Sequence, residues 1–333
     1  MQFGGGRTMD HYTKDYKITI PHLKSREGGL VSYNRILGDF TYDYSQKVLN
    51  DHRLHAVNFC FFILWNADKL GGRLNHTIWM KRELSIQGGG TIDLASPLFA
   101  ERFYENDHLP DVRRDMSYFR EYGIECQYML IKDLHGNDNI GECENVAVQI
   151  EVEPDTGGLA ITPITLADMN RILLDNSNGP FKNKKPLNLY ETDLEHYLSI
   201  HAQRTGALFP GDCDMMLYDD DNRCQYIIEF KKCTARGNIP IKEQSFWNYI
   251  AKDRSKFLRL NILRNDFSRR SNREIPLLNV FYPTTNERTV KVEEIRPDMG
   301  VGRSWCFPLA SEPERNQRMI LDSIEEHFPR WGN

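Results

Sequence analysis

Two acidic residues and a lysine in the second half of the chain have the types and spacing needed for metal-assisted hydrolysis. Asp214 begins a short apolar run, and Glu229 and Lys231 end a second one, with turn residues between the two runs. Apolar runs joined by Asp and Asn predict a β-hairpin. Two carboxylates aimed at one point suit Mg²⁺ or Mn²⁺, and an ammonium beside them can balance charge on a phosphate. The trio therefore predicts a divalent-cation site.

The register of this hairpin decides which residues face each other. With a loop at residues 220–223, residues whose numbers sum to 443 lie opposite one another, so Asp214 faces Glu229 and Asp212 faces Lys231. Opposed side chains on one sheet face have Cβ atoms roughly 5 Å apart, so the two carboxylates repel unless a proton, a basic group or a cation relieves them. Strand alternation places Lys231 on the same face as Glu229. A shorter loop would set Asp212 against Glu229, and that alternative stays open.

An ordinary exposed hairpin is the competing explanation of this segment. It suits Asp219, Asp220 and Asp221, which lie in the turn itself. It suits Asp214 and Glu229 less well, because each sits in or beside an apolar strand, where an unpaired charge is costly. We therefore prefer the functional interpretation for these two carboxylates and for the lysine beside them.

The same residues resemble a known nuclease signature. The order Gly-Asp-x-Asp at 211–214, an apolar strand, a turn and then Glu-Phe-Lys at 229–231 is similar to the PD-(D/E)xK superfamily, which includes many restriction endonucleases, resolvases and repair nucleases. The resemblance covers about residues 188–285, and it departs from the signature because Pro210 and Asp214 are not adjacent. It implies an α/β fold of the mixed α+β kind, with a restriction-endonuclease-like core in which helices flank a central mixed sheet.

The resemblance also implies roles for individual residues. Asp214 and Glu229 would ligate Mg²⁺ or Mn²⁺, and the backbone carbonyl of Phe230 would be a further ligand. Lys231 would assist the attacking water. These roles describe a metal-dependent hydrolase that acts on phosphodiester bonds.

Two further positions follow from the resemblance. Family members often add an acidic residue from the helix before the hairpin, which makes Glu191 the first candidate and Glu195 the second. Thr192 to Glu195 is also the spacing of a capping box, which is a structural alternative. A polar residue on the helix after the hairpin often faces the site, and Gln244 is the matching position here.

Positive charge is concentrated directly after the proposed site. Residues 229–273 contain twelve Lys and Arg against four Asp and Glu, in a chain whose net charge is -5. Such side chains bind phosphates strongly without reading a base sequence. A solvated helix face is the competing explanation for any single residue. As a group, these residues predict contact with nucleic acid: Lys232, Arg236, Lys242, Lys252, Arg254 and Lys256.

Composition excludes several other classes of protein. Hydrophobic content of 40% and charged content of 27% are typical of a globular protein. Seven scattered cysteines without a C-x-x-C pair indicate reduced thiols in the cytoplasm. The longest apolar run, 57–65, is too short to span a bilayer. We expect a cytoplasmic protein without a membrane partner, and a homo-oligomer remains open.

A stretch rich in Asn, Gly, Lys and Pro at 175–186 divides the chain into an α+β N-terminal region, 1–180, and a nuclease domain, 181–333. No internal repeat is visible in the sequence. Periodicity predicts helices over 52–70, 110–122, 166–174, 188–204, 241–252 and 313–327. It predicts strands over 124–131, 146–152, 213–218, 224–232, 258–263 and 277–282.

The preferred prediction is a metal-dependent nuclease that hydrolyses DNA, with RNA as the alternative substrate and restriction or defence as the biological setting. The N-terminal region would then recognise the substrate, regulate the nuclease or bind a partner. One competing hypothesis is a nuclease fold that grips nucleic acid without cutting it. Another is a sensor whose N-terminal half binds a nucleotide and whose C-terminal half is the effector.

Overall fold

The computed structural model describes residues 17–19, 43–65, 73–87, 93–105, 109–132, 143–153, 156–176, 211–233, 239–283 and 286–330. This part of the chain is mixed α/β, as the sequence predicts. Its strands are β1 (Lys17–Thr19), β2 (Leu54–Trp65), β3 (Arg73–Gln87), β4 (Glu125–Lys132), β5 (Asn145–Val152), β6 (Leu159–Thr165), β7 (Gly211–Asp219), β8 (Cys224–Cys233), β9 (Leu277–Pro283), β10 (Thr289–Ile295) and β11 (Val301–Pro308). Its helices are α2 (Asp43–Asp51), α3 (Pro97–Tyr104), α4 (Leu109–Glu121), α5 (Leu166–Asn176), the 3₁₀ turn η2 (Ile241–Glu243), α7 (Trp247–Ser271) and α8 (Pro313–His327).

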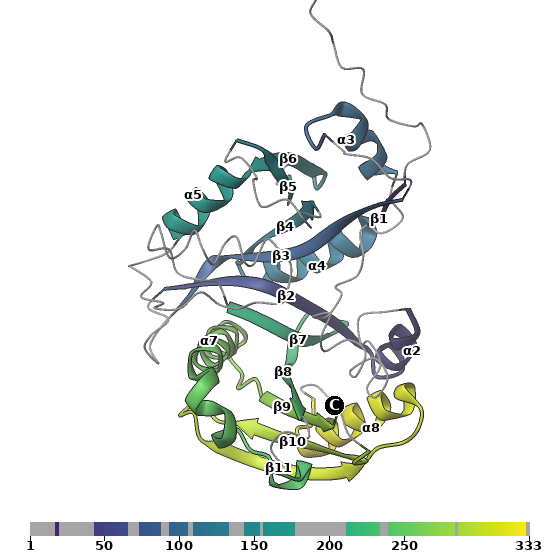
Figure 1. Cartoon of the computed structure of the whole chain (residues 1–333), viewed down its shortest axis with the longest axis vertical. Helices are drawn as coiled ribbons and strands as arrows, with labels where there is room; N and C mark the ends of the chain where they lie inside the picture. Colours follow the sequence, from purple (N-terminus) through teal and green to yellow (C-terminus); the bar gives the residue numbers. More distant parts are fainter. Residues whose placement is uncertain are drawn as a thin grey trace, which may run out of the picture.

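All of these strands belong to one twisted sheet (Figure 1). The strand order is β11-β10-β9-β8-β7-β2-β3-β4-β5-β6, and β1 pairs with β3. The pairs β3–β4 and β8–β9 are parallel, and the other pairs are antiparallel. Two parallel neighbouring strands need a crossover connection, which is usually a helix. Helix α4 lies in the connection from β3 to β4, and α7 lies in the connection from β8 to β9.

The sheet consists of two units with the same topology. In the N-terminal unit, β2 and β3 form a hairpin, α4 leads to β4 parallel to β3, and β5, β6 and α5 follow. In the C-terminal unit, β7 and β8 form a hairpin, α7 leads to β9 parallel to β8, and β10, β11 and α8 follow. The chain therefore contains a structural repeat, although no repeat is visible in its sequence. Strand pairing depends on apolar pattern rather than on residue identity, so the same topology can be built from different residues.

The two units meet where β2 pairs with β7 in antiparallel fashion. The paired residues run from Leu54 opposite Asp219, through Val57 opposite Met216, to Phe62 opposite Gly211. An antiparallel pair between equivalent strands relates the units by an approximate two-fold rotation. The sheet thus continues from the predicted N-terminal region into the predicted nuclease domain. Their proposed boundary, near residue 180, lies outside the described residues.

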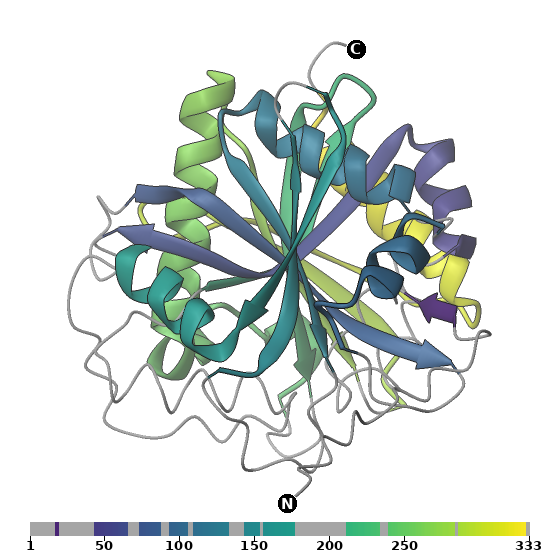
Figure 2. The same ribbon diagram turned by 90° about the horizontal axis from the view of Figure 1, so that it is seen from above.

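Helices cover both faces of the sheet, as Figure 2 shows with α7 on one side of the fanned strands and α2 and α8 on the other. The core on the first face joins α4 and α7, whose rings Phe119 and Phe267 have centroids 6.2 Å apart. The second core packs Val48 of α2 and Ile324 of α8 against the opposite face. The proposed site lies under α7, on the first face.

Most of the elements predicted from periodicity are present, two are wrong, and one helix is present with different bounds. The segment predicted as a helix at 52–70 contains β2, because its aromatic and branched residues suit a central strand. The helix predicted at 241–252 and the strand at 258–263 are together η2 and the single helix α7. A short run of Leu and Ile cannot distinguish a buried strand from a buried helix. The helix predicted at 188–204 lies outside the described residues.

No helix among the described residues is long and apolar enough to cross a membrane.

Candidate metal and catalytic site

The β7–β8 hairpin has the register that the sequence predicts. Met215 pairs with Ile228 and Leu217 with Tyr226, so partner numbers sum to 443. The turn begins one residue earlier than expected, with Tyr218 opposite Cys224, and a bulge after Leu217 restores the register. Continuing the same register places Asp214 opposite Glu229. The side chain of Asp212 is outside the described set, so its competing role stays open.

The carboxylates of Asp214 and Glu229 converge on one ammonium group. The Nζ atom of Lys256, on α7, lies 2.7 Å from Glu229 Oε1 and 3.6 Å from Asp214 Oδ1. The other oxygen of Asp214, Oδ2, accepts a hydrogen bond from the backbone N–H of Phe230 at 2.9 Å. A cation between the two strands therefore relieves the repulsion expected between the carboxylates, and in this structure that cation is a lysine.

Lys231 is a second ammonium group at the same oxygen of Glu229. Its Nζ atom is 3.0 Å from Glu229 Oε1 and 3.0 Å from Asp253 Oδ2. The same ammonium lies 4.8 Å from the ring centroid of Phe257. Burial lowers the pKa of Lys231, but the carboxylates of Glu229 and Asp253 outweigh it and leave the pKa above its ordinary value. Lys231 is consequently cationic at neutral pH and can stabilise negative charge rather than remove protons.

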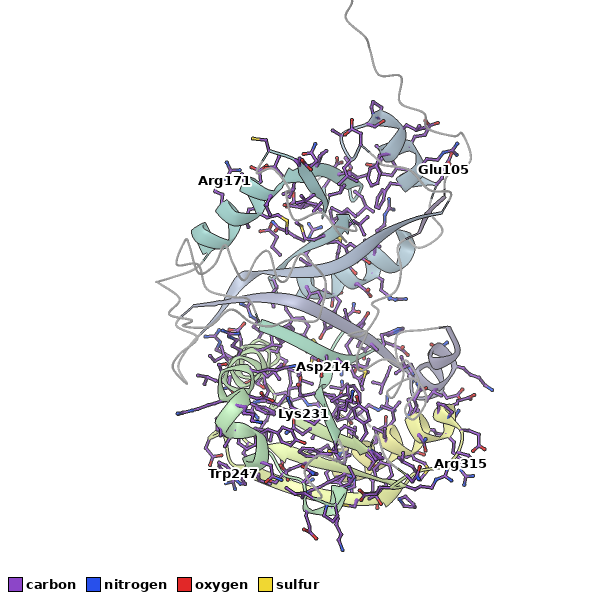
Figure 3. The ribbon with its side chains drawn as sticks, viewed as in Figure 1. Glu105, Arg171, Asp214, Lys231, Trp247 and Arg315 are labelled. Atoms are coloured by element: carbon purple, nitrogen blue, oxygen red, sulfur yellow. The ribbon has the colours of Figure 1, made fainter. Side chains whose placement is uncertain are left out.

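The two outer carboxylates of this cluster are more exposed than the central one. Glu229 is 1% exposed, whereas Asp214 is 26% and Asp253 36% exposed. Figure 3 shows Asp214 and Lys231 close together beside α7, near the centre of the C-terminal unit. An ion or phosphate from the solvent would therefore approach the cluster from the side of Asp214 and Asp253, and Glu229 is its buried member.

The donors present fit a hard divalent cation. Asp214, Glu229 and Asp253 carry three negative charges against the two positive charges of Lys231 and Lys256. The net charge of the cluster is therefore −1, and it becomes −2 if the Lys256 side chain moves away. The Lys256 ammonium acts as a stand-in ion, because it marks a point that both Asp214 and Glu229 reach. No group of three or more His, Cys, Asp or Glu suited to a metal occurs within the described ranges, but Mg²⁺ needs fewer protein ligands because it keeps several waters.

The start of α7 is fixed by a buried carboxylate from β10 rather than by a capping side chain of its own. Glu293 Oε1 accepts hydrogen bonds from Phe246 N at 2.6 Å and Ser245 Oγ at 3.2 Å. Its Oε2 atom lies 3.2 Å from the ammonium of Lys291. A negative charge at a helix N-terminus is favourable. This contact sets the position of α7 and hence of Asp253 and Lys256.

Gln244 lies next to the start of α7, and its hydrogen bonds within the described part of the chain are to residues other than Asp214 and Glu229. Its Nε2 atom donates to Ile239 O at 3.0 Å, and its Oε1 accepts from Tyr249 Oη at 3.2 Å. Lys291 donates to its backbone carbonyl. These bonds give Gln244 a structural role in the described part of the chain. Three other proposed residues, Glu191, Glu195 and Arg236, lie outside that part.

The residues predicted to bind nucleic acid separate into groups. Lys242, Lys252 and Arg254 are exposed, and Lys232 is half-buried. Lys256 is part of the acidic cluster instead of the outer surface. Other arginines of the basic segment serve the fold: Arg264 is 2% exposed and donates to Ile295 O, and Arg270 and Arg273 donate to Tyr122 O and to Gln225.

Sequence reasoning missed the contribution of Asp253 to this site. Asp253 and Lys256 are three residues apart, so on one continuous helix they share a face. That signal was hidden because a strand was predicted from 258 onward, which ended the helix too early. The wrong break also assigned Lys256 to the outer surface.

Comparisons with known proteins identify no family for the chain. No family model matches it, and no curated protein does. A solved structure described as the crystal structure of a sex pheromone staph-cAM373 precursor is 6% identical, with a TM-score of 0.19, over 89% of this chain and 86% of that chain. A likeness at that TM-score carries no argument about fold or function.

Proposed function

We propose that the chain is a metal-dependent nuclease that hydrolyses phosphodiester bonds at the cluster of Asp214, Glu229 and Lys231. The observation that carries the proposal is the shared cation position between Asp214 and Glu229, at 3.6 Å and 2.7 Å from one ammonium. The restriction-endonuclease-like core belongs to the same proposal, as does DNA as the substrate.

Each residue has a distinct part in the proposed reaction. Asp214 and Glu229 hold Mg²⁺ or Mn²⁺, with the carbonyl of Phe230 as a further ligand. When bound, such an ion polarises a phosphoryl oxygen and lowers the pKa of a water. Lys231, cationic and held by Glu229 and Asp253, stabilises the charge that develops on the phosphate. Lys256 withdraws from the shared position, which its 19% exposure permits.

The surface beside the cluster suits the phosphate backbone of a nucleic acid. Lys242, Lys252 and Arg254 are exposed around the start of α7. Trp247, the first residue of α7, is 56% exposed and offers a face on which a base can stack. This combination of cations and an aromatic ring favours DNA, and single-stranded regions in particular, over a small phosphate ester.

The proposal is tested by cleavage of plasmid and single-stranded DNA with Mg²⁺, Mn²⁺ or EDTA. We expect cutting that requires the metal, and a loss of about 10²–10³-fold or more in Lys231→Ala, the scale of losing one charge-stabilising group. Asp266→Asn is the control for a buried charge outside the site, because Asp266 of α7 is a buried carboxylate that pairs with Arg269 and Arg270 away from the cluster. Equal cutting by the wild type and Lys231→Ala would remove Lys231 from the mechanism.

A second candidate function is a nucleic-acid-binding module with this fold and no activity. The position of Lys256 favours it, because the ammonium already occupies the point shared by the two carboxylates that would hold a metal. The same assay separates the two candidates. Metal-independent retention of DNA on a gel, without cutting under any metal condition, is the result expected of the binding module.

A further inference from the structure

A buried amide lies beside the proposed metal site without a hydrogen-bond partner. Asn279, on β9, is 0% exposed, and neither its Nδ2 nor its Oδ1 atom has a partner among the described residues. An unsatisfied buried polar group costs about 1–3 kcal/mol. Such a group in a folded core requires an explanation, of which a bound water or ion is one.

The register of the sheet places Asn279 in a row of acidic side chains. Asn279 pairs with Glu229 of β8 on one side and with Glu293 of β10 on the other. Its neighbours Leu278 and Val280 belong to the core on the α8 side, so Asn279 points toward α7, as Glu229 and Glu293 do. All three are at most 1% exposed.

The two neighbouring carboxylates differ in what they already bind. Glu293 is occupied by the start of α7 and by Lys291. Glu229 faces the position that the Lys256 ammonium shares with Asp214. The side of Asn279 toward Glu229 is therefore the side on which a solvent-borne ligand could arrive.

Distance decides how Asn279 could take part. Neighbouring strands are about 4.8 Å apart, so Asn279 is two strand spacings from Asp214 and one from Glu229. An asparagine side chain is too short to reach an ion placed between Asp214 and Glu229. A water beside that ion lies within its reach, and an amide can both donate to such a water and accept from it.

We propose that Asn279 is a positioning residue of the metal site, which holds a water of the divalent cation bound by Asp214 and Glu229. This inference rests on the proposed function and adds to it an outer-sphere group. Mg²⁺ retains several waters in proteins, and groups that orient the ligands of a metal commonly change its affinity by about 10–100-fold.

The test is Mn²⁺ binding to the full chain, measured by calorimetry and by the electron paramagnetic resonance of free Mn²⁺. Asn279→Leu keeps the branched shape of the side chain and removes the amide, so we expect an affinity loss of about tenfold or more. Asn279→Asp keeps a water-binding oxygen, and we expect it to bind Mn²⁺ at least as tightly as the wild type. Gln317→Leu is the matched control, because Gln317 is also 0% exposed with both amide atoms unpartnered among the described residues, but lies on α8.

Stability separates a metal-related role from a structural one. With EDTA present, Asn279→Leu should unfold at the same temperature as the wild type or a higher one, because an unsatisfied amide is gone, and it should lose most of the stabilisation by Mn²⁺. If Asn279→Leu does not fold, Asn279→Ser in the same titration decides, with an affinity loss expected again.

Wild-type affinity in both Asn279→Leu and Asn279→Ser, with Glu229→Gln binding no Mn²⁺, would overturn the role of Asn279 and leave the metal site intact. Wild-type affinity in Glu229→Gln would instead overturn the metal site itself.

Discussion

At the scale of residues, the central feature is a lysine in the place where a metal would bind. Lys256 lies between Asp214 and Glu229, and Lys231 lies between Glu229 and Asp253. The two lysines differ in what they could do. Lys231 is held on both sides by carboxylates in a nearly buried position, whereas Lys256 approaches from α7 and can leave. Metal binding and Lys256 should therefore compete for the same two carboxylates.

Replacing Lys256 by Met should weaken the metal-free fold and strengthen metal binding. Loss of the ammonium leaves Asp214 and Glu229 repelling each other, which we expect to cost on the order of 1–3 kcal/mol of unfolding free energy in EDTA. The same loss removes a competitor, so Mn²⁺ should bind about tenfold more tightly, or about 1.4 kcal/mol. Urea unfolding in EDTA and calorimetric titration with Mn²⁺ measure the two effects.

Lys252→Met is the matched control for this prediction. Lys252 lies one helical turn earlier on α7 and is exposed. Its replacement by Met therefore removes the same charge without affecting the carboxylates. It should change neither quantity much. Equal Mn²⁺ affinity in Lys256→Met and Lys252→Met would contradict the competition.

At the scale of elements, the hairpin was predictable and the helix above it was not. The register of β7 and β8 followed from the apolar run on each side of a polar turn. The observed pairs have that register, and its continuation sets Asp214 opposite Glu229. The extent of α7 depends on tertiary contacts that local pattern does not contain. Its start is fixed by Glu293, 47 residues after Phe246, and its buried residues pack against strands from both units of the sheet. Consequently Asp253 was missed, and the position of Lys256 was misjudged.

The Glu293–Lys291 pair gives a prediction about the start of α7. Glu293→Leu removes the hydrogen bonds to Phe246 and Ser245 and leaves Lys291 buried without its carboxylate, so it should cost about 3–5 kcal/mol of unfolding free energy. The double variant Lys291→Met, Glu293→Leu removes the stranded charge and should be the more stable of the two. Urea unfolding of the two single variants and the double variant gives the coupling energy. Additive effects would show that the two side chains do not depend on each other.

At the scale of the whole molecule, two units of the same topology share one sheet. Their contact includes the β2–β7 pairing and a stack of Tyr118 of α4 on Tyr218 of β7, with ring centroids 4.0 Å apart. Arg270 of α7 also donates to Tyr122 O at the end of α4. The two-region division foreseen from the sequence remains a prediction, and these contacts make each unit depend on the other.

The fragment 181–333 should therefore behave worse than the full chain. Without β2, strand β7 becomes an open edge, and Tyr218, 0% exposed in the full chain, becomes accessible. We expect the fragment to self-associate or to lose cooperative unfolding. Light scattering after size exclusion, together with thermal unfolding, measures both. A monomeric fragment with a sharp unfolding transition would show that the C-terminal unit is an independent domain.

The buried tyrosines at this contact predict a loss of stability at alkaline pH. Burial raises the pKa of Tyr122 to about 12 and that of the Cys224 thiol to about 12, and it also raises the pKa values of Tyr118 and Tyr218. In the unfolded chain tyrosines ionise near pH ~10 and thiols near ~8.5. The unfolded state thus releases protons first, so stability present below about pH 8.5 should fall as the pH rises toward about 12. Urea midpoints from pH 8 to 11 measure this, and a flat profile would contradict the burial of these groups.

The most direct test of the whole interpretation is a crystal of the protein soaked with Mn²⁺ and measured at a wavelength where manganese scatters anomalously. We expect an anomalous peak between the carboxylates of Asp214 and Glu229, with the ammonium of Lys256 moved out of that position. An ammonium still bridging the two carboxylates at saturating Mn²⁺, with no peak beside them, would contradict it.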